Sequence, residues 1–524
     1  MQRDTSVADR YWHDTFRDSV SVLARGVGSE GGPDEPRKFK AYRGLPRQRL
    51  PQRSAARLGD LAKAFGFGAS EPAPSGPLDE ERLGLLLYHG YGYSRTDVGA
   101  IGGWPHHRFV PSARCFYPTE LYLWRPDSGS CSHYDQLHHS LVELRANVSA
   151  ETVCAALGSD LSGAAGVLFI TSHFWKTAFR YRHYAHRLCS QEAGMVAGNL
   201  LLVGQVLGLR GHVHYQFLDE VLDRLLGLPS DEERTVAAIV LYPDEAGAPA
   251  QPRPRAQSHA ASAVLKSVPP ITPAFLDVVK DLSLASSVYE LAEASVLRSV
   301  GDFAEPLPAG PPPGPAGNEL NLSKVEIAPV DLAVALRDRH SGGTLFCPLA
   351  RSAPADTVAR LARYVGRRYA SDIGIGPHCY TVLVVQDVAG VAPGVYRCTD
   401  DGRLQLVAGT REKPLDAETV ATLGPPITDY RRTNLVAFVV GDQTHSAHLG
   451  NRGYRILNQD AGLMAQRICV LAAAAGLAAR PLNGYLVAPV QRMLGIEHPD
   501  HLPMFQIAIG HRATTAQYEM EIAF

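Results

Sequence analysis

One short stretch of the chain places a phenol beside a permanent cation. The sequence FWKTAFRYRHYAHR covers residues 174–187, and in it Tyr181 directly follows Arg180. A neighbouring positive charge favours the phenolate form of a tyrosine, so this pair has the chemistry of a proton acceptor. Packing of Tyr181 as an ordinary aromatic, with Arg180 as a surface charge, is the alternative interpretation.

A second stretch combines arginines with a serine. The sequence LRDRHSGGTLF covers residues 336–346 and contains Arg337, Arg339 and Ser341. Arginine stays protonated and can bind an oxyanion through two N–H groups, which suits this stretch to holding a phosphate. An ordinary solvated helix start is the alternative for these residues.

The composition limits the classes of protein to consider. The 524 residues carry a formal net charge of −2, and 45% of them are hydrophobic, which is typical of a soluble globular protein. This balance gives no electrostatic reason to expect nucleic acid or membrane binding. The eight cysteines show no metal-binding spacing, and we expect no metal. With neither a signal peptide nor a membrane-spanning stretch evident, we expect a cytoplasmic protein.

The chain contains an internal repeat. A shift of 268 positions places residues 191–228 on residues 459–496 without a gap, with 10 of 38 positions identical. Each copy has a strand, a loop and a long helix that we expect to start near an Ala-Gly pair, at 193–194 and at 461–462. The small residues allow close approach to another backbone, and Gly208 and Gly476 can end the helices. A duplicated α+β unit indicates an intramolecular pseudo-dimer.

Proline-rich and glycine-rich segments suggest the boundaries of the repeat. Residues 274–300 have helical spacing and predict a helix, whereas 302–318 have the composition of a structureless linker. The predicted organisation is an N-terminal extension at 1–79, a first domain at 80–245, a connector and linker at 246–324, and a second domain at 325–524.

The order of these motifs resembles a known enzyme family. The stretch HHRFVPSARCFYPTELYLW at 106–124, then residues 174–187, then Glu-Ala-Gly and a Gly-Leu helix end are similar to the nitroreductase-fold flavin dehydrogenases. Within them, the azoline dehydrogenases of ribosomal peptide pathways, including the thiopeptide type, resemble the chain most. The resemblance covers 80–245 well and 325–515 more weakly.

The resemblance implies a fold, a cofactor and a reaction. It implies two tandem copies of an α+β nitroreductase-like fold with FMN at their interface. It implies oxidation of thiazoline or oxazoline rings in a precursor peptide to aromatic azoles, following a cyclodehydratase that could be a partner. The pseudo-dimer could act as a monomer or pair as a homodimer.

The resemblance also assigns roles to individual residues. Arg339 and Ser341 match a phosphate-binding Arg-x-Ser at a helix start, with Arg337 able to compensate for a lost arginine. Arg108 and Ser112 match a loop that contacts the flavin, although Pro111-Ser112 is equally typical of a plain turn. Tyr181 matches the tyrosine of a catalytic Lys-Tyr pair in which Arg180 has replaced the lysine.

The two copies do not keep the same candidate residues. At the 268 shift, Arg180 and Tyr181 fall on His448 and Leu449. Arg187 falls on Arg455, which suits either a phosphate contact or a structural salt bridge. We therefore expect one composite site per chain. Two other functions stay open: an NAD(P)H-dependent nitro or quinone reductase, and a degenerate, non-catalytic peptide-binding subunit.

Overall fold

The computed structural model describes most of the chain. It covers residues 3–26, 35–51, 57–67, 78–98, 105–244, 253–254, 259–278, 280–307, 318–399, 401–407, 415–513 and 518–522. Part of the predicted linker, at 308–317, lies outside the described residues.

Two largely antiparallel β-sheets with the same strand order form the framework of the fold. The first runs β1 (Arg47–Arg49), β6 (Ser140–Arg145), β5 (Ser130–Asp135), β4 (Thr119–Arg125), β8 (Gly166–His173), β10 (Glu233–Pro243), β9 (Leu209–His214), β13 (Tyr369–Ser371) and β14 (Gly374–Gly376). The second runs β12 (Glu319–Leu320), β17 (Leu404–Leu406), β16 (Gly394–Cys398), β15 (Tyr380–Val385), β18 (Leu435–Asp442), β20 (His501–Gly510) and β19 (Ala478–Leu482). The seven strands of the second sheet match the first seven of the first, position by position.

The 268-residue shift also relates elements of the two halves in the structure. It places the first residue of helix α8 (Asp219–Leu226) on the first residue of α16 (Val487–Met493). It likewise places the start of β10 on the start of β20. This correspondence supports the predicted tandem arrangement.

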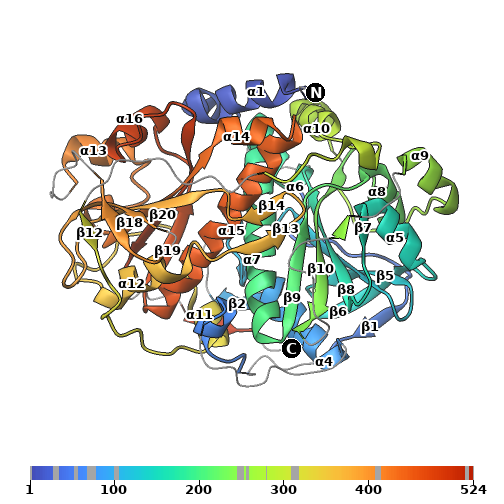
Figure 1. The fold of residues 1–524 in the computed structure, drawn as a ribbon, viewed down its shortest axis with the longest axis horizontal. Coiled ribbons are helices and arrows are strands. Elements are labelled where there is room, and N and C mark those ends of the chain that lie inside the picture. Colours follow the sequence, from blue (N-terminus) through green and yellow to red (C-terminus); the bar gives the residue numbers. More distant parts are fainter. Residues whose placement is uncertain are drawn as a thin grey trace.

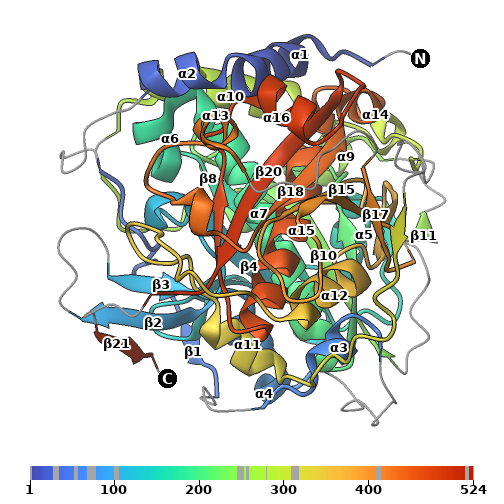
Figure 2. The same cartoon turned by 90° about the vertical axis from the view of Figure 1, so that its left-hand side faces the viewer.

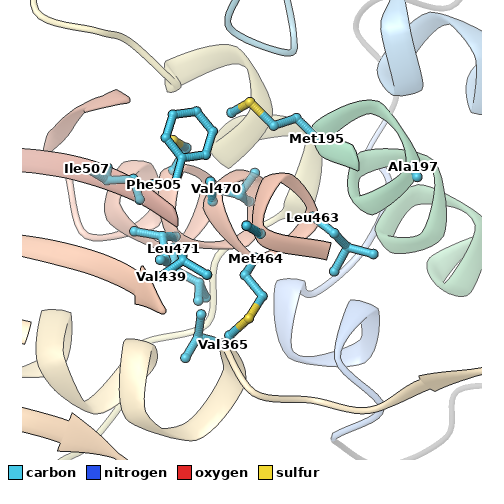
Figure 3. Packing of buried hydrophobic residues seen from close by; sticks show 14 of the residues in the cluster. Met195, Ala197, Val365, Val439, Leu463, Met464, Val470, Leu471, Phe505 and Ile507 are labelled. Carbon is cyan, nitrogen blue, oxygen red and sulfur yellow. The ribbon is translucent and has the colours of Figure 1, made fainter. Parts of the chain in front are cut away.

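Two long buried helices separate the sheets. Helices α7 (Ala185–Val206) and α15 (Arg452–Ala474) lie side by side at the centre, with the first sheet beyond α7 and the second beyond α15 (Figure 1). Figure 3 shows Met195 and Ala197 of α7 beside α15, with Val439 of β18 and Phe505 of β20 among the side chains that pack around α15.

The two helices touch at the predicted glycines. A Cβ atom on Gly194 would lie 1.8 Å from the carbonyl oxygen of Gln459, and one on Gly462 would lie 2.0 Å from that of Gln191. These two contacts are related by the 268 shift, so the crossing is pseudo-symmetric. The prediction that the helices begin near the Ala-Gly pairs is wrong, because both begin well before them. Gly208 (φ +72°) and Gly476 (φ +74°) adopt the left-handed conformation after the helices, as predicted.

Segments of the second half join the first half. The hairpin β13–β14 extends the first sheet, with β13 parallel to β9. The C-terminal strand β21 (Tyr518–Glu521) pairs with β2 (Tyr93–Val98), which also pairs with β3 (His106–Arg108) (Figure 2). Because of these exchanges the halves are intertwined, and the domain boundaries stay a prediction.

The helix expected at 274–300 is shorter in the structure. Only α10 (Ser286–Ala294) is α-helical there, preceded by a single 3-10 turn. Phe275 instead forms a bridge with Tyr42, and the Leu276 N–H donates to the carbonyl of Ala41. Long-range pairing with the N-terminal extension therefore overrides the local helical pattern.

Shorter elements surround this framework. They are α1 (Ser6–Trp12), the π-helical turn His13–Arg17, α2 (Ser19–Gly26), α3 (Leu61–Ala64), α4 (Glu80–Tyr91), α5 (Ala150–Leu157), α6 (Trp175–Tyr181), α9 (Ala261–Val264), α11 (Leu332–Asp338), α12 (Ala355–Tyr364), α13 (Ala417–Thr422), α14 (Gln443–Ala447), β7 (Ser159–Asp160) and β11 (Arg253–Pro254). Among the described residues, no helix has the length and apolar character needed to cross a membrane.

Candidate functional site

The loop that carries Ser112 has an unusual backbone. Arg114, Cys115 and Tyr117 have φ angles of +51°, +56° and +49°. Residues with a Cβ seldom adopt this region, and such conformations persist only where the surroundings impose them, often at functional sites. Here the Ser112 hydroxyl oxygen accepts a hydrogen bond from the Tyr117 N–H at 2.9 Å. The unusual backbone marks this loop as a candidate site.

A buried lysine joins this loop to helix α6. The Lys176 ammonium donates to the carbonyl oxygen of Tyr117 at 3.2 Å and to the Glu120 carboxylate. Burial lowers the pKa of Lys176. Burial alone would raise the pKa of Glu120, but the Lys176 charge and a hydrogen bond from His133 hold it well below its usual range. Lys176 therefore fixes the position of the loop relative to α6.

The predicted pair Arg180–Tyr181 lies at the end of the same helix. Arg180 is buried and Tyr181 is half-buried. The Tyr181 ring meets the ring of Phe116 edge to face at 6.3 Å. The next residue, Arg182, ends α6 with φ +49° and ψ −128°. The two segments with unusual backbone are thus in contact, with Tyr181 between them.

The candidate phosphate anchor, Arg339 with Ser341, does not lie at the start of a helix as the sequence analysis expected. Arg339 and Ser341 follow the C-terminus of α11, so the predicted helix start is wrong. The Asp331 carboxylate caps the start of α11 instead, accepting from the Ala333 N–H at 2.8 Å. Gly342 and Gly343 then turn the chain with φ of +81° and +84°. No helix dipole is available to favour an anion at this place.

Arg339 nevertheless reaches the loop of the other half. It is buried, and it donates from Nε to the Phe109 carbonyl at 2.8 Å and from Nη2 to the Arg108 carbonyl at 3.1 Å. Its Nη1 is buried without a hydrogen-bond partner. Burial lowers the pKa of Arg339 to about 10, so it stays protonated at neutral pH. The structure therefore brings together Arg339 and the segment that begins at Arg108.

Arg108 is completely buried among aromatic rings. Its guanidinium lies 4.4 Å from the ring centre of Tyr91 and 4.6 Å from that of Tyr117. Nη2 donates to the Lys38 carbonyl, whereas Nε and Nη1 have no hydrogen-bond partner. Unused buried N–H donors are costly, and they fit a ligand that presents oxygen acceptors.

The other two residues predicted to anchor the cofactor, Arg337 and Ser341, make contacts elsewhere. Ser341 contributes its carbonyl, which accepts from Arg480 Nε at 2.9 Å. Arg337 is one-third exposed and lies 3.5 Å from Glu521 of β21. Neither contact involves the loop at 108–112, so the roles of Arg337 and Ser341 in cofactor binding stay predictions.

The contacts of Arg187 tie parts of the fold together. It is fully buried, with its guanidinium 3.6 Å from the ring centre of Phe16. It donates to the carbonyls of Thr15 and Met504 and to the hydroxyl of Tyr485. These bonds join the N-terminal extension, α7 and the second sheet. A cofactor contact for Arg187 stays a prediction.

The sequence analysis used the Glu-Ala-Gly motif of α7 but gave its acidic residue, Glu192, no role of its own. Glu192 is buried and accepts from the Tyr91 hydroxyl at 2.9 Å, and burial raises its pKa. Its repeat counterpart Asp460 accepts from the N–H groups of His378 and Cys379, both at 2.8 Å. The sequence did carry a signal for these two residues, because both long apolar helices have a carboxylate at the same repeat position. Within the described ranges, no three His, Cys, Asp or Glu residues are grouped to hold a metal ion.

Comparisons with known proteins agree on the fold. The nitroreductase family model matches residues 411–511. A protein from Anabaena variabilis ATCC 29413, assigned as a nitroreductase, superposes with a TM-score of 0.68 over 97% of this chain and 100% of its own, at 18% identity. A chain of the Escherichia coli microcin synthetase McbBCD complex with truncated pro-MccB17 bound is 20% identical, covers 38% of this chain and 75% of its own, and has a TM-score of only 0.27.

One curated relative is similar in sequence. The microcin B17-processing protein McbC of Escherichia coli is 26% identical over 161 residues, which are 28% of this chain and 56% of McbC. The match thus spans little more than half of that relative. Together, the strand order, the two central helices and the superposition on the Anabaena structure show an α+β protein of nitroreductase-like fold, in which residues 411–511 match the nitroreductase family model.

Proposed function

We propose that the protein is an FMN-dependent dehydrogenase that oxidises thiazoline or oxazoline rings in a ribosomally made peptide to thiazoles or oxazoles. The observation that carries the proposal is the contact of Arg339 from the second half with the carbonyls of Arg108 and Phe109, just before the strained loop of the first half, in a chain similar to McbC. This contact between the halves supports the composite site that we propose from the unequal copies.

The donors at this junction fit a flavin. Arg339 Nη1 and two nitrogens of Arg108 are buried donors without partners, and FMN offers phosphate, ribityl and ring oxygens as acceptors. We assign Arg339 to an anionic part of the cofactor and Arg108 with Ser112 to its neutral part. When bound, FMN supplies the hydride acceptor.

Residues of the protein would then accept the proton and hold the substrate ring in position. Tyr181 would take the proton that the azoline ring loses, and Arg180 would supply a neighbouring positive charge. Lys176 would keep the loop in place through Tyr117, so that ring and base meet in one orientation. The precursor peptide is the proposed substrate, and a cyclodehydratase of the same pathway is the proposed partner.

Replacement of Tyr181 by phenylalanine tests the proton acceptor. We expect turnover of an azoline peptide to fall at least about 100-fold, because general-base catalysis contributes factors of this size. The measurement is mass spectrometry of the peptide, which loses about 2 Da for each ring oxidised. Tyr289→Phe is the matched control, since Tyr289 packs against the same apolar cluster and its hydroxyl has no partner. Full activity of Tyr181→Phe with bound flavin would refute the assignment.

Replacement of Arg339 by methionine tests the anchor. We expect FMN binding, followed by fluorescence quenching, to weaken at least about tenfold, because a charge-assisted contact is lost. Arg339→Lys should bind with intermediate affinity, since lysine keeps the charge but not the planar fork. Arg492→Met, which changes an exposed arginine of the same half, is the control. Unchanged FMN affinity in Arg339→Met would exclude Arg339 as an anchor.

The flavin absorbance of the purified protein and its change on addition of NAD(P)H distinguish the alternative functions. A yellow protein that bleaches rapidly with NAD(P)H and leaves azoline peptides unchanged would favour the nitro or quinone reductase. A colourless protein that binds an azoline peptide but cannot be loaded with FMN would favour the non-catalytic subunit.

A further inference from the structure

A thiol, an imidazole and a carboxylate lie in line beside the strained loop. Cys115 Sγ is 3.6 Å from Nδ1 of His107, and Nε2 of His107 is 2.9 Å from Oδ2 of Asp97. Because the ionised Asp97 carboxylate can only accept a hydrogen bond, it holds the ring proton on Nε2. The lone pair of Nδ1 is then directed at the Cys115 thiol and can accept its proton.

Strands β2 and β3 place the imidazole beside the carboxylate (Figure 2). In their antiparallel register His107 lies opposite Arg95, and Asp97 is two residues further along β2 on the same face. The neighbouring His106 belongs to the other face, where its Nδ1 is 2.7 Å from Thr96 Oγ1. The pairing of the two strands therefore selects His107 as the partner of the carboxylate.

The strained loop brings the thiol to the imidazole. The Cys115 N–H donates to the Ser112 carbonyl at 3.1 Å, and both Arg114 and Cys115 have left-handed φ angles. This turn returns Cys115 to His107, eight positions before it in the chain. Cys115 is half-buried, so part of the residue is open to small molecules. A backbone conformation of this kind persists only where the surrounding structure imposes it.

The protonation states suit transfer of a proton from sulfur to nitrogen. Burial raises the pKa of Cys115, so the group is a thiol at neutral pH. Burial, helped by the charge of Arg95, lowers the pKa of His107, so its ring is uncharged and can take the proton. The positive charges of Arg95, Lys38 and Arg339 favour negative charge on the sulfur once the proton has left.

The arrangement is that of a nucleophile rather than of a metal site. The thiol and the carboxylate contact opposite nitrogens of one ring, so the three groups do not converge on a single point. A nucleophile, a base within hydrogen-bond reach of it and a third group that orients the base are the parts of an acyl-transfer site.

We propose that Cys115, His107 and Asp97 form a nucleophilic site at which Cys115 takes an acyl group from an ester or thioester. The sulfur attacks the carbonyl carbon while His107 accepts the thiol proton. A sulfur–carbon bond forms, the bond from the carbonyl carbon to the leaving oxygen or sulfur breaks, and His107 passes the proton to the leaving group. Cys115 and His107 are catalytic residues, and Asp97 is a positioning residue.

This reaction goes beyond the proposed function and does not depend on it. Acyl transfer to a thiol exchanges no electrons with a cofactor, so it needs no flavin. Failure of the protein to bind FMN or to oxidise azolines would sink the proposed function and leave the reactivity of Cys115 to be measured separately.

Acetylation by p-nitrophenyl acetate tests the site on the full-length wild-type protein. Mass spectrometry of the digested protein gives the rate of acetylation at each cysteine. We expect Cys115 to react at least about tenfold faster than Cys347, although Cys347 is exposed and Cys115 is half-buried. Both rates come from one sample, so the comparison needs no variant that folds. A Cys115 rate no higher than that of Cys347 would overturn the proposal.

Replacement of the base tests what activates the thiol. His107→Gln should slow acetylation of Cys115 at least about 100-fold, because general-base catalysis contributes factors of this size. His106→Gln is the matched control on the same strand, since its ring contacts Thr96 on the opposite face, and it should leave the rate unchanged. Equal rates in His107→Gln and in the wild type would assign the reactivity to the nearby positive charges and contradict the proposal.

Replacement of the carboxylate tests the positioning role. Asp97→Ala should slow acetylation of Cys115 about tenfold, because the imidazole loses the hydrogen bond that fixes its tautomer. Asp97→Asn should recover part of the rate, since its amide oxygen can accept the same hydrogen bond from Nε2. Undiminished acetylation in Asp97→Ala would remove Asp97 from the site and overturn the three-residue arrangement.

Discussion

Gly194→Ala should destabilise the protein by at least about 3 kcal/mol and leave much of it insoluble. The added methyl would lie 1.8 Å from the Gln459 carbonyl oxygen, a distance that no rotation of a side chain can relieve. Helices α7 and α15 would have to separate along their shared length. Since each packs on its own sheet, the separation would loosen both halves together. Denaturant titration of soluble protein measures the loss.

The repeat offers both a replicate and a control for this change. Gly462→Ala places its methyl 2.0 Å from the Gln191 carbonyl oxygen and should have a similar effect. Gly204→Ala alters the same helix, where the closest neighbour of the new Cβ is an ordinary 3.4 Å away. It should be neutral or stabilise by up to about 1 kcal/mol, because alanine favours a helix more than glycine does. Equal stability of Gly194→Ala and Gly204→Ala would show that the two helices do not cross as described.

Lys40→Met should cost about 3 to 5 kcal/mol at neutral pH. Lys40 and Glu233 form an ion pair at 2.6 Å with both side chains buried. Tyr122 and Thr171 donate their hydroxyls to the same carboxylate, at 2.9 and 2.6 Å. Methionine matches the length of lysine, so the main loss is the charge that compensates the carboxylate. Adding Glu233→Gln to Lys40→Met should recover part of the stability, because it removes the uncompensated charge.

The pH dependence of this pair has a definite sign. Burial opposes ionisation of Glu233, but the Lys40 ammonium prevails and lowers the pKa from 4.5 to about 2. The stability that the carboxylate contributes is therefore present above pH 4.5 and lost as the pH falls towards 2. In Lys40→Met the ammonium no longer offsets burial, so the pKa of Glu233 should be higher than in the wild type, and the variant should lose less stability on acidification. Urea titrations at pH 7 and at about pH 3, inside the range in which the wild type loses this stability, compare the two. A parallel loss in both would contradict the pairing.

The candidate site was only partly predictable from local sequence. The proximity of Arg180 and Tyr181 to the Ser112 loop involves contacts between residues about 65 positions apart, which no periodicity reports. Arg339 was identified by its residue type, but its position was misjudged, because the cap at Asp331 and the glycines after Ser341 place the helix before it. Lys176 and Glu120 were missed, because a buried ion pair leaves no pattern along the chain.

The resemblance of the motifs implied the nitroreductase-like α+β fold, and the amino-acid sequence was enough to predict the repeat and the small residues at the helix crossing. These features are expressed locally, through the spacing of apolar residues and the need for glycine where two backbones touch. The contact of Arg339 from the second half with Arg108 and Phe109 of the first half became evident only in the folded chain. Arg339 donates to carbonyls some 230 residues away, and Glu519 reaches His340 through a strand that pairs with the first half. Such contacts join residues that are far apart in the chain. They depend on how the two halves pack and pair in the folded protein, which no local pattern of residues reports.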